Sequence, residues 1–147
     1  MSYQNILVPI DGSEISLSAA KRAAEIAKAL GSQLTAISIV AEDPFSAADF
    51  YYTPDMLKGY IIEAHKSAEQ ALEKVKNIAA QVGVAINTEV INGPVFAETI
   101  TETATKLGTD LIVIGSHGRK GFKKFLLGSF AQDVLSNTHL PVLVIKQ

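Results

Sequence analysis

Five short apolar segments, each separated from the next by a stretch of helical length, restrict this chain to few folds. Four of them are continuous and rich in β-branched residues, which is typical of strands buried on both faces of a parallel sheet. They cover residues 6–10, 34–40, 111–114 and 142–145. The fifth, residues 85–91, alternates more between apolar and polar side chains, so we expect it nearer an edge of the sheet.

The stretches between these segments have helical periodicity and recognisable ends. In the first stretch, Ser13 is the expected N-cap and Gly31 the stop. Its apolar face is formed by Leu17, Ala20, Ala24, Ala27 and Leu30. The run Thr53-Pro54-Asp55 predicts the start of a long second helix that keeps its period until Gly83. Two shorter helices are predicted at about residues 95–107 and 129–137.

Strands that alternate with helices predict a single α/β domain, which fits a length of 147 residues. We expect a half-Rossmann-like parallel sheet of five strands in the order 3-2-1-4-5, with helices on both faces and right-handed crossovers. In that order the topology switches between the first and fourth strands, where ligands bind at the carboxyl ends. Asp11 and Gly115 end those two strands, so we expect a crevice beside them.

Composition excludes several classes of function. The chain is 48% hydrophobic and has a formal net charge of -2, which fits a folded core and argues against a general nucleic-acid-binding protein. Because it has no cysteine, disulfides and thiolate metal sites are excluded. The sequence shows no signal-peptide pattern and no apolar run long enough to span a bilayer. We therefore expect a cytoplasmic protein with neither nucleic acid nor membrane as partner.

The segment 111–130 has the layout of a strand, an anion-binding loop and a helix start. Glycines stand at Gly115, Gly118 and Gly128, and Ser129 follows as the expected N-cap. Glycine allows a positive φ and a close approach of the backbone to a ligand, and a helix N-terminus favours phosphate. The cations in the segment are Arg119, Lys120, Lys123 and Lys124, and no acid occurs from Leu111 to Gln132. The segment therefore predicts a phosphate site.

Neither a P-loop nor a dinucleotide fingerprint is present, because no glycine here precedes Lys-[ST] and the first strand leads into Pro9-Ile10-Asp11-Gly12-Ser13. The spacing G-x2-G-x9-G-[ST] instead resembles that of the nucleotide-binding members of the universal stress protein family. Residues 5–13 and 141–145 also look like the first and last strands of that family. The resemblance implies an ATP-binding protein with a role in stress survival, and a homodimer.

The candidate nucleotide-binding residues follow from these motifs and this resemblance. Asp11 either contacts the adenosine or forms a turn with Ser13, and Val40 could read the adenine edge with its backbone. Arg119 is the best charged phosphate contact, whereas His117 either contacts the nucleotide or makes a local hydrogen bond. The full set is Pro9, Asp11, Val40, Gly115, His117, Gly118, Arg119, Gly128, Ser129 and Phe130. No protein metal site is predicted, and any Mg²⁺ would be held by phosphate oxygens and water.

Three functions remain open at this point. The first is a regulatory stress-response protein that holds ATP and acts on an unknown client protein. The second is a slow ATPase, phosphotransferase or nucleotidyltransferase that uses the same site, although the sequence offers no nucleophile–base pair. The third is an interaction module with an empty pocket. Two further expectations concern surfaces: residues 141–146 pair with a second copy, and the aromatic segment 41–53 either packs or covers the base.

Overall fold

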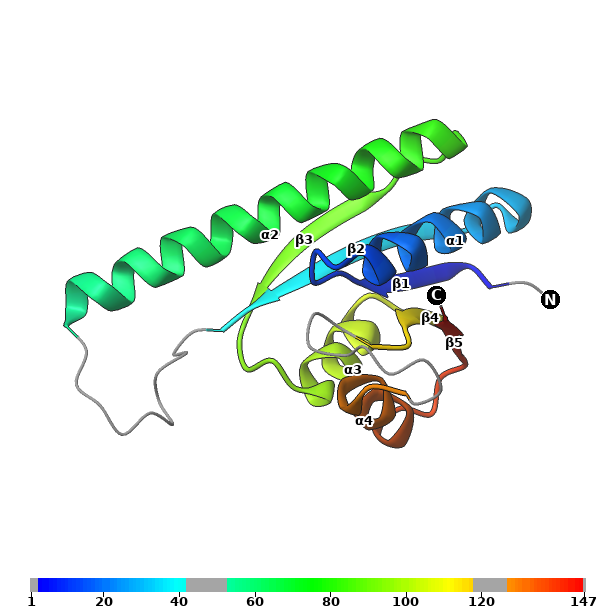
Figure 1. Cartoon of the computed structure of the whole chain (residues 1–147). Helices are drawn as coiled ribbons and strands as arrows, with labels where there is room; N and C mark the ends of the chain where they lie inside the picture. Colours follow the sequence, from blue (N-terminus) through cyan, green and yellow to red (C-terminus); the bar gives the residue numbers. More distant parts are fainter. Residues whose placement is uncertain (1–2, 42–52, 118–126, 147) are drawn as a thin grey trace.

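The computed structural model describes residues 3–41, 53–117 and 127–146 and contains one parallel sheet of five strands (Figure 1). The strand order is β3-β2-β1-β4-β5, so the predicted order 3-2-1-4-5 is confirmed. The strands are β1 (Asn5–Pro9), β2 (Gln33–Val40), β3 (Asn87–Asn92), β4 (Leu111–Gly115) and β5 (Val142–Ile145). The alternating segment forms β3, which is an edge strand as its polar pattern predicts.

The helices are α1 (Glu14–Leu30), α2 (Pro54–Val82), α3 (Ala97–Lys106) and α4 (Ser129–Asn137). Their ends follow local chemistry: the Ser13 hydroxyl caps α1, and the Thr53 hydroxyl accepts from the Met56 N–H at the start of α2. Both helices end at a glycine in the left-handed region, with φ of 70° at Gly31 and 92° at Gly83. These predicted boundaries are therefore confirmed.

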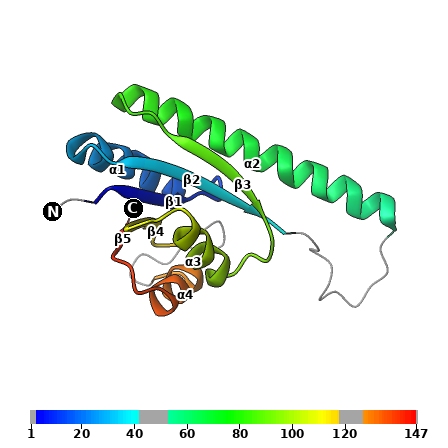
Figure 2. The same ribbon diagram turned by 180° about the vertical axis from the view of Figure 1, so that it is seen from behind.

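The helices cover the two faces of the sheet in pairs, α1 and α2 on one face and α3 and α4 on the other (Figures 1 and 2). Side chains alternate along each strand, so each strand contributes to both cores. Ile6 and Val8 of β1 pack in the core under α1 and α2. Leu7 packs in the core with α3 and α4. The same alternation in β2 places Ala36 with α1 and α2, and Ile37 with α3 and α4.

Two local expectations were wrong. Leu30 is 42% exposed instead of completing the apolar face of α1, because the buried face of that helix ends at Ala27. The N-cap of α4 is Gly128 and not Ser129, which is already the first helical residue. A tertiary hydrogen bond that positions Gly128 decides this boundary and is described below.

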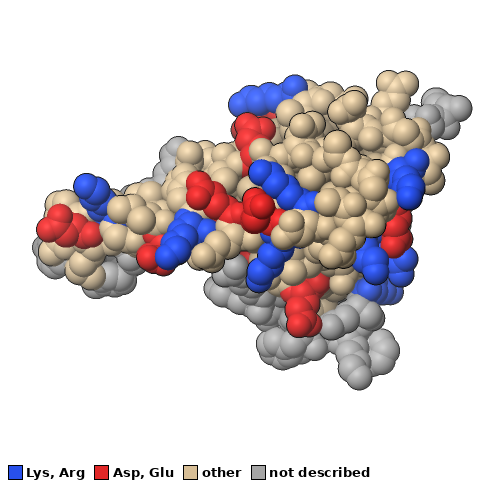
Figure 3. All heavy atoms as spheres, turned by 90° about the horizontal axis from the view of Figure 1, so that it is seen from above, with Lys and Arg blue, Asp and Glu red and all other residues tan. Residues whose placement is uncertain are grey.

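The helix α2 is longer than the strand it covers. Its 29 residues span about 43 Å, whereas the 8 residues of β2 span about 26 Å. The buried residues of α2 begin only at Ala68, so residues 54–67 contain none. Figures 1 and 2 show this first half of α2 projecting beyond the sheet. Figure 3 shows Lys, Arg, Asp and Glu interspersed on the surface seen from above, without a region of one sign.

Candidate functional site

A pocket of about 820 Å³ opens at the carboxyl ends of the strands, where the topology switches between β1 and β4. Its lining contains every candidate residue that the structure describes. These are Pro9, Asp11, Val40, Gly115, His117, Gly128, Ser129 and Phe130. Gly118, Arg119 and the aromatic residues Phe45, Phe50, Tyr51 and Tyr52 lie outside the described residues, as do Lys120, Lys123 and Lys124.

Pro9 helps to open the crevice between β1 and β4. The Ile10 N–H donates to the Ile37 carbonyl at 2.7 Å, so even-numbered residues at this end of β1 direct their backbone groups toward β2 and odd-numbered ones toward β4. Proline at position 9 has no N–H to continue the ladder with β4. The register of that ladder accordingly contains only the pairs Ile6–Leu111 and Leu7–Ile112. Beyond them the two strands leave room for a ligand.

The first turn of α4 directs unused backbone donors at this pocket. Its N-cap, Gly128, has no side chain to cap the helix. The N–H groups of Ser129, Phe130 and Ala131 form no hydrogen bond to another described residue, and all three residues line the pocket. The first N–H groups of any helix lack partners within the helix, and together with its dipole they favour an anion.

The start of α4 is held against the end of β4 by backbone contacts. The Gly128 N–H donates to the Ser116 carbonyl at 2.6 Å, and the Ser116 N–H donates to the Ile145 carbonyl of β5 at 2.8 Å. The chain passes so close that a Cβ on Gly128 would lie 2.9 Å from the His117 Cα. His117 is half-buried beside this contact, and its Nδ1 is 3.1 Å from the Ser116 Oγ. Glycine is therefore required at position 128 for space.

The structure corrects the reason for the site glycines. Gly128 has a φ of -64°, and Gly115 is not among the described glycines with positive φ. Neither needs the left-handed region that the sequence argument invoked. Gly115 is instead buried at the end of β4, where a Cβ would lie 3.2 Å from side-chain carbons of Ile15. Close packing, and not a special backbone angle, is what these two glycines provide.

Asp11 forms the turn that leads into α1. Its Oδ1 accepts hydrogen bonds from both the N–H and the hydroxyl of Ser13, and the intervening Gly12 has a φ of 85°. The structural role considered for Asp11 is thus confirmed. The carboxylate is also exposed and lines the pocket, so the turn fixes an acceptor at the edge of the crevice.

The backbone groups that remain unpaired at the end of β2 belong to Ile39 and not to Val40. The Val40 carbonyl already accepts from the Gly93 N–H at 3.0 Å. The backbone N–H and carbonyl of Ile39 point toward β1. The last hydrogen bond between β1 and β2 joins Ile10 to Ile37, so Ile39 lies beyond it. Its N–H and carbonyl form no hydrogen bond to a described residue, and Ile39 lines the pocket. Sequence reasoning missed this residue because the answer depends on where β1 ends.

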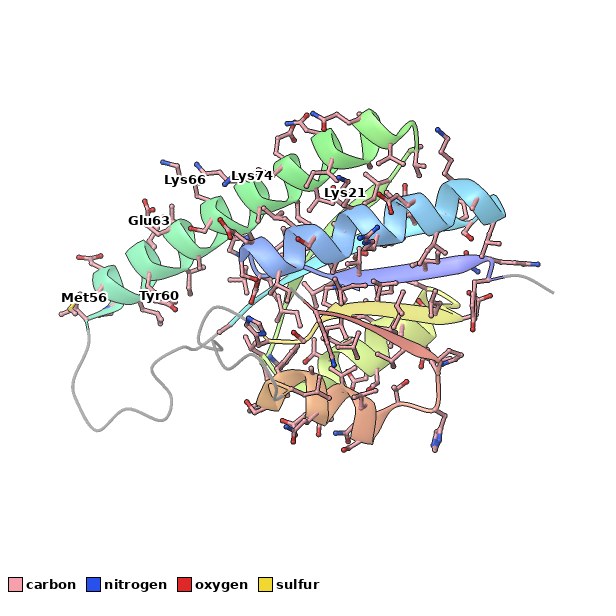
Figure 4. The ribbon with its side chains drawn as sticks, turned by 45° about the vertical axis from the view of Figure 1, so that its right-hand side comes forward. Lys21, Met56, Tyr60, Glu63, Lys66 and Lys74 are labelled. Carbon is pink, nitrogen blue, oxygen red and sulfur yellow. The ribbon has the colours of Figure 1, made fainter. Side chains whose placement is uncertain are left out.

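The long helix α2 supplies a wall that sequence reasoning also missed. Six of its residues line the pocket at helical spacing: Tyr60, Glu63, Ala64, Ser67, Ala68 and Ala71. Figure 4 shows Tyr60 on the side of α2 that faces the rest of the molecule, with Lys66 and Lys74 on the opposite side. The signal that could have found this wall is the difference in length between α2 and β2, because the helix must extend past the strand ends.

Two features are absent from the described residues. Residues 3–41, 53–117 and 127–146 contain no group of three or more His, Cys, Asp or Glu that could hold a metal ion. None of the helices in these ranges is long and apolar enough to cross a membrane.

Comparison with known proteins places this architecture in a family. The model of the universal stress protein family matches residues 2–146, almost the entire chain. This chain belongs to the universal stress protein family. It is 41% identical over 145 residues to universal stress protein MJ0531 of Methanocaldococcus jannaschii. The aligned residues make up 99% of this chain and 83% of that relative. Universal stress protein UspA from Lactobacillus plantarum superposes with a TM-score of 0.83 at 28% identity, covering 99% of each chain.

Two more universal stress protein structures contain nucleotides. One was solved in complex with cAMP, and the other, from Archaeoglobus fulgidus, in complex with dAMP. Their TM-scores are 0.69 and 0.70, each at 24% identity and covering 99% of this chain. They cover 98% and 100% of their own chains, respectively. At this identity the likeness shows a shared fold.

Proposed function

We propose that this universal stress protein binds ATP at the switch point between β1 and β4, and that its output is regulatory. The observation that carries the proposal is the first turn of α4, whose N–H groups at Ser129, Phe130 and Ala131 face a pocket without a partner among the described residues. Such a turn is an anion site. The relatives solved with cAMP and dAMP support an adenine nucleotide as the ligand.

In this arrangement the two ends of the nucleotide meet different chemistry. The phosphates lie over Gly115 and the start of α4, next to His117. The adenosine lies toward Asp11 and the end of β2, where Ile39 offers an unpaired backbone N–H and carbonyl. The sequence additionally assigns Gly118 and Arg119 to the phosphates.

The donors at the start of α4 suit an anion and not a cation, so these residues fit the phosphates and not a bare metal ion. Mg²⁺ would be held by phosphate oxygens and water, and would supply neutralisation of the phosphate charge. The contribution of the chain itself is to orient the phosphates with backbone N–H groups and to position the adenosine at the strand ends.

The proposal includes a homodimer formed through residues 141–146. β5 is an edge strand of the sheet. The carbonyls of Pro141 and Ile145 accept hydrogen bonds from the N–H groups of Ile112 and Ser116 on the inner side. Backbone groups of successive residues in a strand point to opposite sides, so those of Val142 and Val144 point away from β4, out of the sheet. An edge of this kind can pair with its own copy about a two-fold axis.

A pair of substitutions at position 129 tests the nucleotide site. Proline there removes one N–H of the first turn, yet proline is well accepted at the first helical position. Gly128 already has the extended angles, φ -64° and ψ 155°, that a residue before proline prefers. Ser129→Ala keeps the N–H and removes only the hydroxyl.

We expect calorimetry to show ATP binding by the unmodified protein, weaker binding by Ser129→Pro, and a smaller loss in Ser129→Ala. Mass spectrometry of nucleotide carried through native purification would identify the ligand independently. Absence of ATP binding by the unmodified protein at millimolar nucleotide would overturn the proposal. Equal ATP affinity in the proline and alanine variants would overturn the role of the α4 donors.

A further inference from the structure

The pocket extends beyond the strand ends to the inner side of α2. The α2 residues that line it recur at intervals of three and four along one helical stripe, from Tyr60 to Ala71. The inner part of the stripe is made of small side chains, Ala64, Ala68 and Ala71, which leave space between helix and sheet. The stripe carries no Lys or Arg, and Figure 4 shows Lys66 and Lys74 on the opposite side of α2.

Ser38 of β2 faces this stripe. Leu34 and Ala36 belong to the core under α1 and α2, whereas Ile37 belongs to the other core, so even-numbered residues of β2 point to the α2 side. The neighbour of Ser38 on β3 is Val90, which packs against the same core as Ala36. Ser38 also lines the pocket. Its hydroxyl therefore lies in the space between β2 and α2.

The Ser38 hydroxyl has no partner within the protein as described. The residue is only 6% exposed, and its hydroxyl makes no hydrogen bond to any residue in the described ranges. Ser16, the other buried serine in the lining of the pocket, differs because its hydroxyl donates to the Ser13 carbonyl at 2.8 Å. No side-chain nitrogen or oxygen of the described residues is both fully buried and without a hydrogen bond, so the Ser38 hydroxyl must be open to the pocket. There it is available to form a hydrogen bond with a ligand, in place of water.

We propose that Ser38 recognises the base of the bound nucleotide by a hydrogen bond to its edge, within a slot between β2 and the alanines of α2. This inference rests on the proposed nucleotide site and assigns the base end of it. The apolar surface of Ala64, Ala68 and Ala71 fits the face of a flat heteroaromatic ring, and the Ser38 hydroxyl fits its edge. They do not fit a phosphate chain, which needs several donors or cations and finds donors at α4 instead. The ligand class is thus a nucleotide or nucleoside whose base has hydrogen-bonding edge atoms.

Three probes separate the base end of the site from the phosphate end: ATP, adenosine and inorganic tripolyphosphate. We expect Ser38→Ala to weaken ATP and adenosine binding about three- to tenfold, the equivalent of one hydrogen bond, and to leave tripolyphosphate binding unchanged. Ser129→Pro should weaken ATP and tripolyphosphate. Ser18→Ala, on the exposed side of α1 and outside the pocket, is the matched serine control.

A thermal unfolding measurement without ligand distinguishes recognition from a structural role. Because the hydroxyl is unpaired in the described structure, Ser38→Ala should unfold at the same temperature as the unmodified protein or higher. A lower unfolding temperature would show that the hydroxyl supports the fold, and would overturn the inference.

The binding measurements give three results that would contradict the role of Ser38. If Ser38→Ala binds ATP as tightly as Ser18→Ala does, base recognition by Ser38 is wrong while nucleotide binding stands. If Ser38→Ala also loses tripolyphosphate to the same degree, the hydroxyl acts on the phosphates and the assignment is wrong. If the unmodified protein binds neither ATP nor adenosine, this inference and the proposed function fail together.

Discussion

Alanine at position 128 is the sharpest test of how the pocket is built. The added Cβ would lie 2.9 Å from the His117 Cα, 3.1 Å from its Cβ and 3.2 Å from the Ser116 carbonyl oxygen. Two of these three neighbours are backbone atoms, which cannot rotate away, so the start of α4 must move from the end of β4. Overpacking of this kind costs about 1–3 kcal/mol. For a chain of this size that corresponds to a decrease in Tm of roughly 2–12 °C.

Two other glycines provide matched controls for this substitution. Gly59 lies within α2 with nothing near its virtual Cβ, so Gly59→Ala should stabilise the protein by about 0.5–1 kcal/mol. The Cβ of Gly115→Ala would lie 3.2 Å from carbons of the Ile15 side chain, which can shift, and 3.5 Å from the His117 carbonyl oxygen, which is an ordinary contact distance. We therefore expect a smaller loss of stability for Gly115→Ala than for Gly128→Ala.

The measurements are thermal unfolding without ligand and ATP affinity by calorimetry for all three variants. Gly128→Ala should lose both stability and affinity, because the displaced helix start carries the anion-binding N–H groups. Gly59→Ala should keep the affinity of the unmodified protein. A Gly128→Ala variant that is as stable as Gly59→Ala and binds ATP normally would refute the argument that close backbone packing forms this site.

Three further predictions concern other residues. Asp11→Ala should lower the free energy of unfolding by about 1 kcal/mol, because the turn before α1 loses its acceptor, whereas Asp11→Asn keeps an oxygen for Ser13 and should lower it less. Urea unfolding measures both, and equal losses of stability would contradict the turn geometry. Ser129→Ala should change the free energy of unfolding by less than about 0.5 kcal/mol, because Ser129 does not cap α4, and a larger loss would restore it as a cap. Val144→Pro removes an N–H of β5 that points out of the sheet, so it should shift the protein toward monomer in light scattering. Leu143→Pro is the control, because it removes an N–H that points toward β4 and should destabilise the subunit itself. A monomeric unmodified protein at micromolar concentration would contradict the dimer proposal.

The sequence predicted the fold because its local signals agree with one another. The β-branched segments became strands, and Ser13, Gly31, Thr53 and Gly83 bound the two long helices where their cap chemistry indicates. The strand order then follows from general rules for parallel sheets. The same rules brought the described candidates from β1, β2, β4 and α4 into one pocket.

What the sequence did not predict depends on contacts between distant segments. Both Gly128 and Ser129 can cap a helix, and the bond from Gly128 to Ser116 decides between them. Whether Val40 or Ile39 has unpaired backbone groups depends on the register between β1 and β2. Nothing in the sequence distinguishes Ser38 from the other serines, because its position opposite α2 follows only from which face of β2 its side chain occupies.

The overhang of α2 implies a gradient of local stability along a single helix. From Ala68 onward the helix is held by buried side chains, whereas residues 54–67 have no buried side chain, so continuity with that part and the Thr53 cap contribute more to their stability. Amide hydrogen exchange should therefore slow progressively from Met56 toward Val75. Tyr60 and Ser67, on the pocket side, belong to the fast-exchanging half. A ligand that contacts this half would raise its protection first, and the extended end of α2 would then report, at the molecular surface, whether the pocket is occupied.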